Sequence, residues 1–360
     1  MTSCHQLPGE SGPFDVHSKN EGVPMGLDYR VNCCPDGLVT DRRRRIKVLD
    51  CTIRDGGICN EWQFDHHTVQ RVFSALVQAG VDYMEIGYKT RNGIFDRDAV
   101  GPWRFCDEAD LAKVVEPGQL QLATMVDIGR VDLNEIPRCE DSLIDVIRIA
   151  TYAHQLDEAL AILDHCLKQG YETFMNVMAI STLAPDDVDR FLIRLAGSGV
   201  HNVAIVDSFG ALYPYHVRYL VHKYMNYLGK DINVGVHFHN NQQQAFANSI
   251  AAIDEGVDFV DATLHGIGRG AGNCPLELLL FYLDNPKHNI LPVLDLVEEF
   301  ADRREALRWG YHLPYAISGY YNIHPRQAME RMARDDRYQV REMYESLAGR
   351  HEGRKDRRTG

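Results

Sequence analysis

Several features that would place this chain in a special class are missing from its 360 residues. It has no run of about 18 apolar residues, the length that a membrane-spanning helix needs. Its first residues lack the basic and then apolar pattern of a secretory signal, so we expect a cytoplasmic protein. Its nine cysteines are an odd number without a repeated spacing, which favours reduced thiols over a disulfide framework.

The chain also has fewer basic residues than acidic ones. The chain has 51 Asp and Glu residues against 38 Lys and Arg residues, which gives a formal net charge of −13. So acidic a chain is a poor general binder of nucleic acid or of an anionic membrane. Hydrophobic residues make up 45% and charged residues 25%, which is the ordinary balance of a globular protein and excludes a disordered or fibrous one.

The two ends differ from the rest of the sequence. Residues 1–45 contain Gly, Pro, Ser and Asn without a period and end in the basic run Arg42–Arg45, which predicts an extension with little structure of its own. A solvated hinge explains the arginines better than a nucleic-acid site. The pair Cys33–Cys34 has no second pair at zinc spacing, so a metal site there is the weaker alternative. Residues 350–360 predict a frayed basic tail.

Between these ends, short apolar runs alternate with amphipathic stretches, and many of the latter begin at a capping residue such as Asp65 and end at a glycine such as Gly80. Strands are predicted at Ile46–Ile53, Tyr83–Tyr88, Leu120–Val126, Leu143–Tyr152, Thr173–Ile180, Asn202–Ser208, Asn233–His239 and Phe259–Leu264. Eight strands, most of them followed by a helix, predict an α/β fold, a (β/α)₈ TIM barrel over residues 46–285. A doubly wound open sheet is disfavoured because no glycine-rich dinucleotide motif follows the first strand.

Amphipathic stretches near 292–308 and 325–348 predict a helical C-terminal region over residues 286–349. The stretch 309–326 is unusually aromatic, which is more typical of a core or an interface than of an active site. Its candidate lid residues are Tyr315, Tyr321 and His324.

Polar residues at the carboxyl ends of barrel strands are the candidates for an active site. Alternate side chains of a strand share a face, so His237 and His239 point the same way and could bind one ion. Asp55 after the first strand and Asn273 after the eighth could complete the site. This mixed set of oxygen and nitrogen ligands suits Mn²⁺ or Mg²⁺ better than a closed Zn²⁺ site, although Zn²⁺ stays an alternative. A pair of core histidines with backbone partners is the competing interpretation.

An ion with open positions could chelate a 2-oxo acid through its carboxylate and keto oxygens, and so stabilise an enolate. Arg54 keeps its charge at any working pH and would suit the developing enolate oxygen; a structural salt bridge at the barrel rim is the alternative. Other polar strand-end residues are candidates for substrate binding: Glu85, Arg148, Asp207 and Arg269.

Three segments together resemble signature elements of the DRE-TIM metallolyases, or HMGL-like superfamily: Asp50–Gly56, His237–His239 and Gly266–Asn273. That superfamily includes 3-hydroxy-3-methylglutaryl-CoA lyase, 2-isopropylmalate and homocitrate synthases, and 4-hydroxy-2-oxovalerate aldolase. The resemblance covers residues 46–285. It implies that Asp55, His237 and His239 bind the metal, joined by Asn273 as in the lyase branch, and that Arg54 stabilises the enolate. Residues 237–277 look most like the aldolase group and related aldolase-like proteins.

The chain also departs from each branch. Ile58 stands where the aldolase group has the His that serves as its catalytic base. Arg269 stands in the loop where the lyase branch has a catalytic Cys. The same loop lacks the Glu that the synthases usually have there. The general acid or base is therefore left open among His265, Cys59, Tyr88 and a C-terminal tyrosine such as Tyr321.

We therefore predict a divalent-metal-dependent carbon–carbon lyase, an aldolase that acts on a 2-oxo acid and an aldehyde or ketone. The alternatives are a Claisen-type condensation of an acyl-CoA with a 2-oxo acid and a catalytically weak partner subunit. We also expect a homo-oligomer, and the resemblance allows a dehydrogenase partner that takes the aldehyde.

Overall fold

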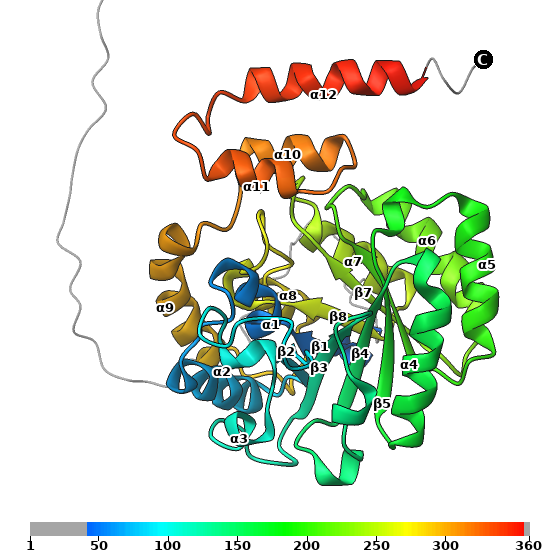
Figure 1. Ribbon diagram of the computed structural model, residues 1–360, viewed down its shortest axis with the longest axis vertical. Coiled ribbons are helices and arrows are strands. Elements are labelled where there is room, and N and C mark those ends of the chain that lie inside the picture. The colour runs from blue at the N-terminus through cyan, green and yellow to red at the C-terminus, as the bar shows by residue number, and fades with distance from the viewer. Residues whose placement is uncertain (1–41, 356–360) are drawn as a thin grey trace, which may run out of the picture. The chain divides into compact units, whose positions relative to one another are not determined.

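Eight parallel strands form a closed barrel in the computed structural model, which describes residues 42–355 (Figure 1). β1 pairs with both β2 and β8, so the predicted (β/α)₈ barrel is confirmed. The strands are β1 (Lys47–Asp50), β2 (Tyr83–Tyr88), β3 (Gln121–Asp127), β4 (Val146–Thr151), β5 (Glu172–Val177), β6 (Asn202–Asp207), β7 (Asn233–Phe238) and β8 (Phe259–Ala262). The barrel helices are α1 (Thr52–Gly56), α2 (His66–Ala79), α3 (Glu108–Leu111), α4 (Leu156–Lys168), α5 (Pro185–Ala196), α6 (Pro214–Leu228), α7 (Ala245–Glu255) and α8 (Leu276–Leu283).

The predicted start and end of helix α2 are confirmed. Asp65 caps α2 by accepting a hydrogen bond from the backbone N–H of Thr68. The helix ends at Gly80, whose φ of 68° lies in the left-handed region that glycine adopts without strain. Four apolar α2 residues at helical spacing are buried against the barrel: Val69, Val72, Phe73 and Leu76.

The first strand is shorter than predicted. The Asp50 carboxylate accepts hydrogen bonds from the Thr52 backbone N–H (3.0 Å) and hydroxyl (2.7 Å). These local bonds turn the chain out of the strand, and α1 begins at once. Arg54 and Asp55 therefore lie on a short buried helix, and the prediction of a strand through Ile53 was wrong.

Side chains that point into the barrel form two layers, which we call the lower and the upper layer. The lower layer is apolar and consists of Leu49, Tyr83, Ala123, Val146, Phe174 and Phe259, together with Cys51 above Leu49. Two residues further along their strands, the same inward face carries the polar upper layer: Glu85, Arg148, His237 and Asp261. Gly235 leaves room for the lower layer, because a Cβ there would lie 3.1 Å from the Cβ of Phe259.

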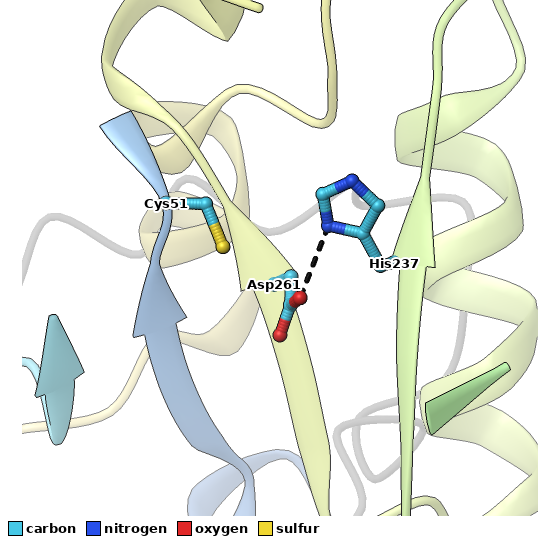
Figure 2. A group of neighbouring side chains, drawn as sticks. All are labelled: Cys51, His237 and Asp261. Carbon is cyan, nitrogen blue, oxygen red and sulfur yellow. Dashed lines mark hydrogen bonds and ion pairs between the residues drawn. The ribbon is translucent and has the colours of Figure 1, made fainter. Parts of the chain in front are cut away.

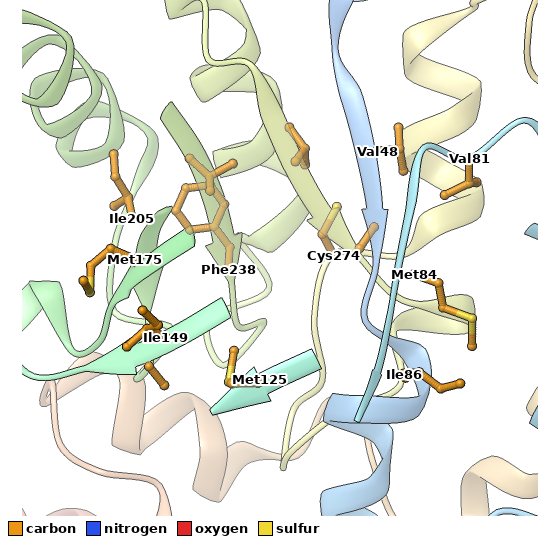
Figure 3. Packing of buried hydrophobic residues seen from close by; sticks show 14 of the residues in the cluster. Val48, Val81, Met84, Ile86, Met125, Ile149, Met175, Ile205, Phe238 and Cys274 are labelled. Carbon is orange, nitrogen blue, oxygen red and sulfur yellow. The ribbon is translucent and has the colours of Figure 1, made fainter. Parts of the chain in front are cut away.

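The outward faces of the strands pack against the surrounding helices (Figure 3). Ile149, Met175, Ile205 and Phe238 come from four successive strands and are nearly inaccessible to solvent. Because both faces of every strand are covered, the backbone is held firmly where the strands end and the polar residues begin.

The predicted C-terminal helices are present as α9 (Leu291–Leu307), α10 (Leu313–Tyr320), α11 (Arg326–Met332) and α12 (Val340–Lys355). Figure 1 shows α10 and α11 at the end of the barrel where the strands finish. The Asn241 side chain, after β7, donates to the backbone oxygen of Tyr315 on α10 (3.3 Å). Asn322, after α10, donates to the Ser181 carbonyl in the loop after β5 (2.7 Å). The C-terminal region therefore contacts the loops that surround the barrel mouth.

The arginine run has contacts with the barrel helices. Arg43–Arg45 form a short 3₁₀ helix, Arg42 donates to the Asp254 carbonyl (2.6 Å), and the Arg43 guanidinium lies 4.0 Å from the ring centre of Tyr282. Arg42, Arg44 and Arg45 are nevertheless exposed, as the predicted solvated run requires, and only Arg43 is partly buried. The predictions for residues 1–41 and 356–360, including Cys33–Cys34, lie outside the described residues.

Two of the predictions concern disulfides and membrane-spanning helices in the described residues. Each cysteine there is free, namely Cys51, Cys59, Cys106, Cys139, Cys166 and Cys274. Among residues 42–355, no helix combines the length and the apolarity that crossing a membrane would require.

Candidate active site

Asp55, His237 and His239 converge at the mouth of the barrel. One ligand atom from each can be chosen such that all three lie within 4.8 Å of one another. The Asp55 Oδ2 atom lies 3.8 Å from His237 Nε2 and 3.7 Å from His239 Nε2. All three side chains are buried, so this group is held in a fixed arrangement out of bulk water.

Both histidines turn Nε2 toward Asp55 and bond through Nδ1 to another acceptor. His239 Nδ1 lies 3.1 Å from the Asp207 carbonyl oxygen, which can only accept, so that nitrogen carries the proton. His237 Nδ1 lies 3.0 Å from Asp261 Oδ2. Burial raises the pKa of Asp261, but Arg148 and His237 together outweigh burial and keep this pKa below its usual range, so the carboxylate accepts. With Nδ1 of each ring bonded elsewhere, Nε2 is the nitrogen that each histidine could offer to a cation beside Asp55.

The pKa values of the group suit metal binding. Burial and the nearby Arg269 charge hold the pKa of His239 well below its usual value, so its imidazole is neutral. Burial raises the pKa of Asp55, but Arg54, the two histidines and the Asn273 hydrogen bond together outweigh burial and keep this pKa well below the usual range. An ionised Asp55 and a neutral His239 are in the protonation states that binding of a divalent ion requires.

Two buried atoms at this place could bind a cation. Within residues 42–355, neither His237 Nε2 nor Asn273 Oδ1 has a hydrogen-bond partner. Asn273 Nδ2 donates to Asp55 Oδ2 and to the Ile267 carbonyl (3.1 Å), so its amide is held beside the carboxylate. Buried polar atoms normally have partners. The four residues together therefore fit a divalent ion held by oxygen and nitrogen ligands.

Arg54 links this group to Glu85. Its Nη1 donates to Asp55 Oδ1 (2.7 Å) and its Nε donates to Glu85 Oε2 (2.6 Å). Both ion pairs are almost inaccessible to solvent. The predicted alternative, a salt-bridged Arg54, is thus present in the structure, and the same guanidinium also lies beside the candidate metal ligands.

Arg148 continues the chain of charges beneath the site. Its Nη1 donates to Glu85 (3.0 Å) and its Nη2 donates to Asp261 (2.5 Å). Asp261 in turn accepts from His237, as the dashed line in Figure 2 shows, and the Cys51 thiol points toward the same carboxylate. Arg148 is fully buried among these partners. Its place, and that of Glu85, is typical of residues that orient the site rather than of residues that touch a substrate.

Asp207 and Arg269 lie on the His239 side of the site. The Asp207 carboxylate accepts from the backbone N–H groups of Ala211 (3.0 Å) and Leu212 (2.9 Å) and so shapes the turn after β6. Burial raises its pKa to about 6. Arg269 donates through Nη2 to the Ser208 carbonyl, and within the described chain its buried Nε has no partner. Arg269 therefore has hydrogen-bonding capacity left for a ligand.

The four candidates for the general acid or base differ in their surroundings. His265 turns toward Glu277 (3.8 Å) and Trp309, and Tyr321 packs against Tyr320 and Tyr344 on the C-terminal helices. The Cys59 thiol, by contrast, donates to the Gly268 carbonyl (3.2 Å) beside the glycine loop.

Tyr88 and Cys59 are the candidates whose pKa is affected by Asp55. Burial is the main cause that raises the pKa of each to about 12, and the Asp55 charge contributes to both values. Both groups therefore keep their protons at neutral pH. In the lid stretch, Tyr315 packs on Gly270 and His324 lies edge-on to Phe209 at 5.7 Å.

Sequence reasoning gave no role to Asp261, although it sets the orientation of His237. The available signal was alternation, because Asp261 shares the inward face of β8 with Phe259 and a charged residue at an inward position needs a buried partner. What the sequence could not supply was the partner, since Arg148 is 113 residues away along the chain.

The chain matches known proteins over most of its length. A family model described as HMGL-like matches residues 45–299. The chain is similar to an oxaloacetate decarboxylase of Mycobacterium tuberculosis, with 30% identity over 73% of this chain and 77% of that protein. It is also similar to a 4-hydroxy-2-oxovalerate aldolase of Thermomicrobium roseum, with 29% identity over 80% of this chain and 86% of that protein.

Solved structures resemble the chain as well. The N-terminal domain of a candidate aldolase from Bacteroides vulgatus superimposes with a TM-score of 0.73 at 30% identity, over 82% of this chain and 99% of that one. An HMG-CoA lyase from Bacillus subtilis gives a TM-score of 0.60 at 17% identity, over 74% of this chain and 95% of that one, a likeness of fold alone.

Proposed function

The chain belongs to the HMGL-like family, and from this membership we propose that it is a divalent-metal-dependent carbon–carbon lyase that acts on a 2-oxo acid. Two of its relatives are named as an aldolase and a decarboxylase, and both names denote cleavage of a carbon–carbon bond in a 2-oxo acid. The observation that carries the proposal is the convergence of Asp55 with two imidazoles whose Nε2 atoms face it.

Asp55, His237 and His239 would hold the ion, with Asn273 Oδ1 as the fourth protein ligand. We propose Mn²⁺ or Mg²⁺ because oxygen ligands balance the imidazoles and the set does not form the closed cysteine-rich site typical of structural Zn²⁺. When bound, such an ion polarises the keto group of a 2-oxo acid and lowers the cost of forming its enolate.

Arg54 is proposed to stabilise the negative charge that develops on the enolate oxygen. Its guanidinium is held from two sides by Asp55 and Glu85, so it needs little rearrangement during the reaction. Arg269 is proposed to bind an oxygen of the substrate through the Nε that has no partner among the residues described. Tyr88 would keep its proton on Oη and donate a hydrogen bond within the site.

Glu85, Arg148 and Asp207 are proposed to position other groups. Glu85 holds Arg54, and Arg148 fixes the Asp261 carboxylate that orients His237. The backbone oxygen of Asp207 orients His239, while its side chain shapes the turn. This assignment replaces the substrate contacts predicted from sequence, because the Glu85 and Arg148 side chains are inaccessible and already paired.

In aldol cleavage of a 4-hydroxy-2-oxo acid, the bond between C3 and C4 breaks and the hydroxyl on C4 loses its proton. The electron pair of that bond becomes the enolate of pyruvate, which then takes a proton at C3. Decarboxylation of a 2-oxo diacid passes through the same enolate, with CO₂ as the other product. The likeness to an oxaloacetate decarboxylase makes this the second candidate reaction.

A homo-oligomer, a dehydrogenase partner and a cytoplasmic location stay predictions. An aldehyde or ketone is the proposed second product, in line with the aldolase relatives. Acyl-CoA condensation and a catalytically weak partner subunit are less well supported, because the named relatives given above are a decarboxylase and an aldolase.

The proposal is tested by exchange of the methyl protons of pyruvate in D₂O. Protein stripped with a chelator and reloaded with Mg²⁺ or Mn²⁺ should incorporate deuterium, measured by mass spectrometry. The stripped protein and the Asp55→Ala variant should not, while circular dichroism shows that the variant is folded. Absence of metal-dependent exchange in the reloaded wild type would contradict the proposed function.

A further inference from the structure

A cavity of about 630 Å³ lies where β4, β5 and β6 end. Its walls come from the loops that follow these strands and from one face of α5. They are mostly apolar or aromatic, and include Tyr152, Met178, Leu183, Phe191 and Phe209. The candidate metal ligands come from the segments after β1 and from β7, so the cavity belongs to a different sector of the barrel mouth.

We propose that this cavity binds the carbon chain beyond C4 of a 4-hydroxy-2-oxo acid, and that the chain is an aryl or alkyl group larger than methyl. The inference rests on the proposed function and adds a substrate class to it. A cavity between about 300 and 1,000 Å³ with apolar walls is typical of a small-molecule site. Acetaldehyde, or the CO₂ released by a decarboxylase, would leave most of this volume unused.

Arg269 connects the cavity with the metal side of the mouth. Its guanidinium contacts the carbonyl of Ser208, and the next residue, Phe209, forms part of the cavity wall. The Ser208 hydroxyl accepts from the backbone N–H of Ala179, another wall residue (2.9 Å). A 2-oxo acid whose oxygens reach Arg269 would therefore have its remaining chain beside the wall at Phe209.

The charges at the cavity rim are already paired. Arg190 forms an ion pair with Asp187, and Arg194 forms one with Asp157 (2.5 Å). The rim therefore has little unpaired charge with which to attract a second acidic group. Selection should come from apolar contact with the walls, which favours an aryl or alkyl chain over a second carboxylate.

The test compares two substrates with the metal-loaded enzyme. 4-Hydroxy-2-oxopentanoate yields pyruvate and acetaldehyde, and 4-hydroxy-2-oxo-6-phenylhexanoate yields pyruvate and 3-phenylpropanal. Pyruvate release is followed with lactate dehydrogenase. We expect kcat/KM to be at least about tenfold higher for the phenyl substrate, within the range that one or two well-placed apolar groups provide. Values within twofold of each other would overturn the inference.

Two substitutions by tryptophan locate the effect. Leu183→Trp places an indole in the cavity and should reduce the preference for the phenyl substrate about tenfold. Ile193→Trp is the matched control, because Ile193 lies on α5, is 60% exposed and does not line the cavity. Arg190→Trp, at the exposed rim, serves if Leu183→Trp fails to fold. A preference that is the same in the cavity variant and the control would overturn the inference.

Pyruvate exchange separates the two possible failures. It needs no chain beyond C3, so it reports on the metal side of the mouth alone. If the wild type exchanges but shows no preference for the phenyl substrate, the chain-binding cavity is wrong and the proposed function stands. If the wild type does not exchange, the proposed function is wrong and the cavity inference falls with it.

Discussion

The two layers inside the barrel share their strands and their direction but not their chemistry. On β2, β4 and β8 the lower layer has Tyr83, Val146 and Phe259, and two residues later the upper layer has Glu85, Arg148 and Asp261. The apolar side chains need only to fill space. The charged ones are equally inaccessible, so each is stable only with an oppositely charged partner in contact. On each of these three strands, two residues along the chain separate the apolar packed core from the charged residues below the site.

The largest difference between the layers should appear on β4. Arg148→Met leaves the Glu85 and Asp261 carboxylates without a shared cation, and we expect it to lower the free energy of unfolding by about 3–5 kcal/mol. Val146→Ala in the lower layer should cost about 2 kcal/mol, from lost apolar burial and a small cavity. Urea unfolding followed by circular dichroism measures both. An equal or smaller cost for Arg148→Met would mean that ion pairs do not hold the upper layer.

The second effect concerns metal binding. Asp261→Asn removes the charge that fixes the tautomer of His237, and we expect divalent-metal affinity to fall about 10–100-fold. Asp258→Asn is the matched control, because Asp258 precedes β8 and bonds to the Val234 backbone N–H at the amino end of the strands. Calorimetric titration with Mn²⁺ compares them. An Asp261→Asn affinity within twofold of the wild type would show that His237 needs no such support.

Asp50 is a buried carboxylate that, within the described residues, is not paired with a cation, and it can be compared with the paired Asp55 and Asp261. Within residues 42–355 the Asp50 carboxylate accepts hydrogen bonds from Thr52 alone, and burial raises its pKa to about 7, whereas the guanidinium-paired Asp55 and Asp261 have lowered pKa values. The folded state therefore holds the Asp50 proton more tightly than the unfolded state does. The stabilising contribution of protonated Asp50 is complete below about pH 4 and is lost as pH rises toward 7.

Asp50→Asn tests this sign. Between about pH 4 and 7, Asp50 should lower the free energy of unfolding by about 1.4 kcal/mol per pH unit. The difference in unfolding free energy between the variant and the wild type should therefore increase with pH across this window. Unfolding curves at four or more pH values measure it. A difference that does not vary with pH would show that Asp50 is ionised in the folded protein.

The smallest effect is expected in the lower layer. Leu49→Val removes one methylene group from a fully buried position and should cost about 1 kcal/mol. The Leu49 side chain is apolar and cannot form a hydrogen bond or an ion pair with the charged groups of the upper layer. Mn²⁺ affinity should therefore not change. Thermal unfolding and the Mn²⁺ titration measure the two quantities. A clear loss of affinity would mean that the layers are coupled through packing.

The sequence predicted the barrel well because its signals are local. Alternating apolar strands, the cap at Asp65 and the stop at Gly80 each involve residues close together in the chain. The convergence of Asp55 with His237 and His239 could also be anticipated, since the carboxyl ends of barrel strands meet at one rim. The helical position of Asp55 was missed because the turn depends on side-chain bonds from Asp50.

The burial and pairing of Glu85 and Arg148 were harder to predict. From sequence, both residues are candidates for substrate contact because they are polar and lie on barrel strands. Their burial and pairing depend on neighbours brought together only by closure of the barrel, such as Arg148 with Asp261. A periodic pattern identifies which face a residue occupies, but it does not reveal how far below the mouth the residue lies.

The central claim is that Asp55, His237 and His239 hold one divalent ion at the top of the upper layer. Titration of chelator-stripped protein with Mn²⁺, followed by calorimetry or by the electron paramagnetic resonance of free Mn²⁺, tests it most directly. We predict one ion bound per wild-type chain and no binding to a folded Asp55→Ala variant. Absence of binding to the wild type, or equal binding to the variant, would contradict the account.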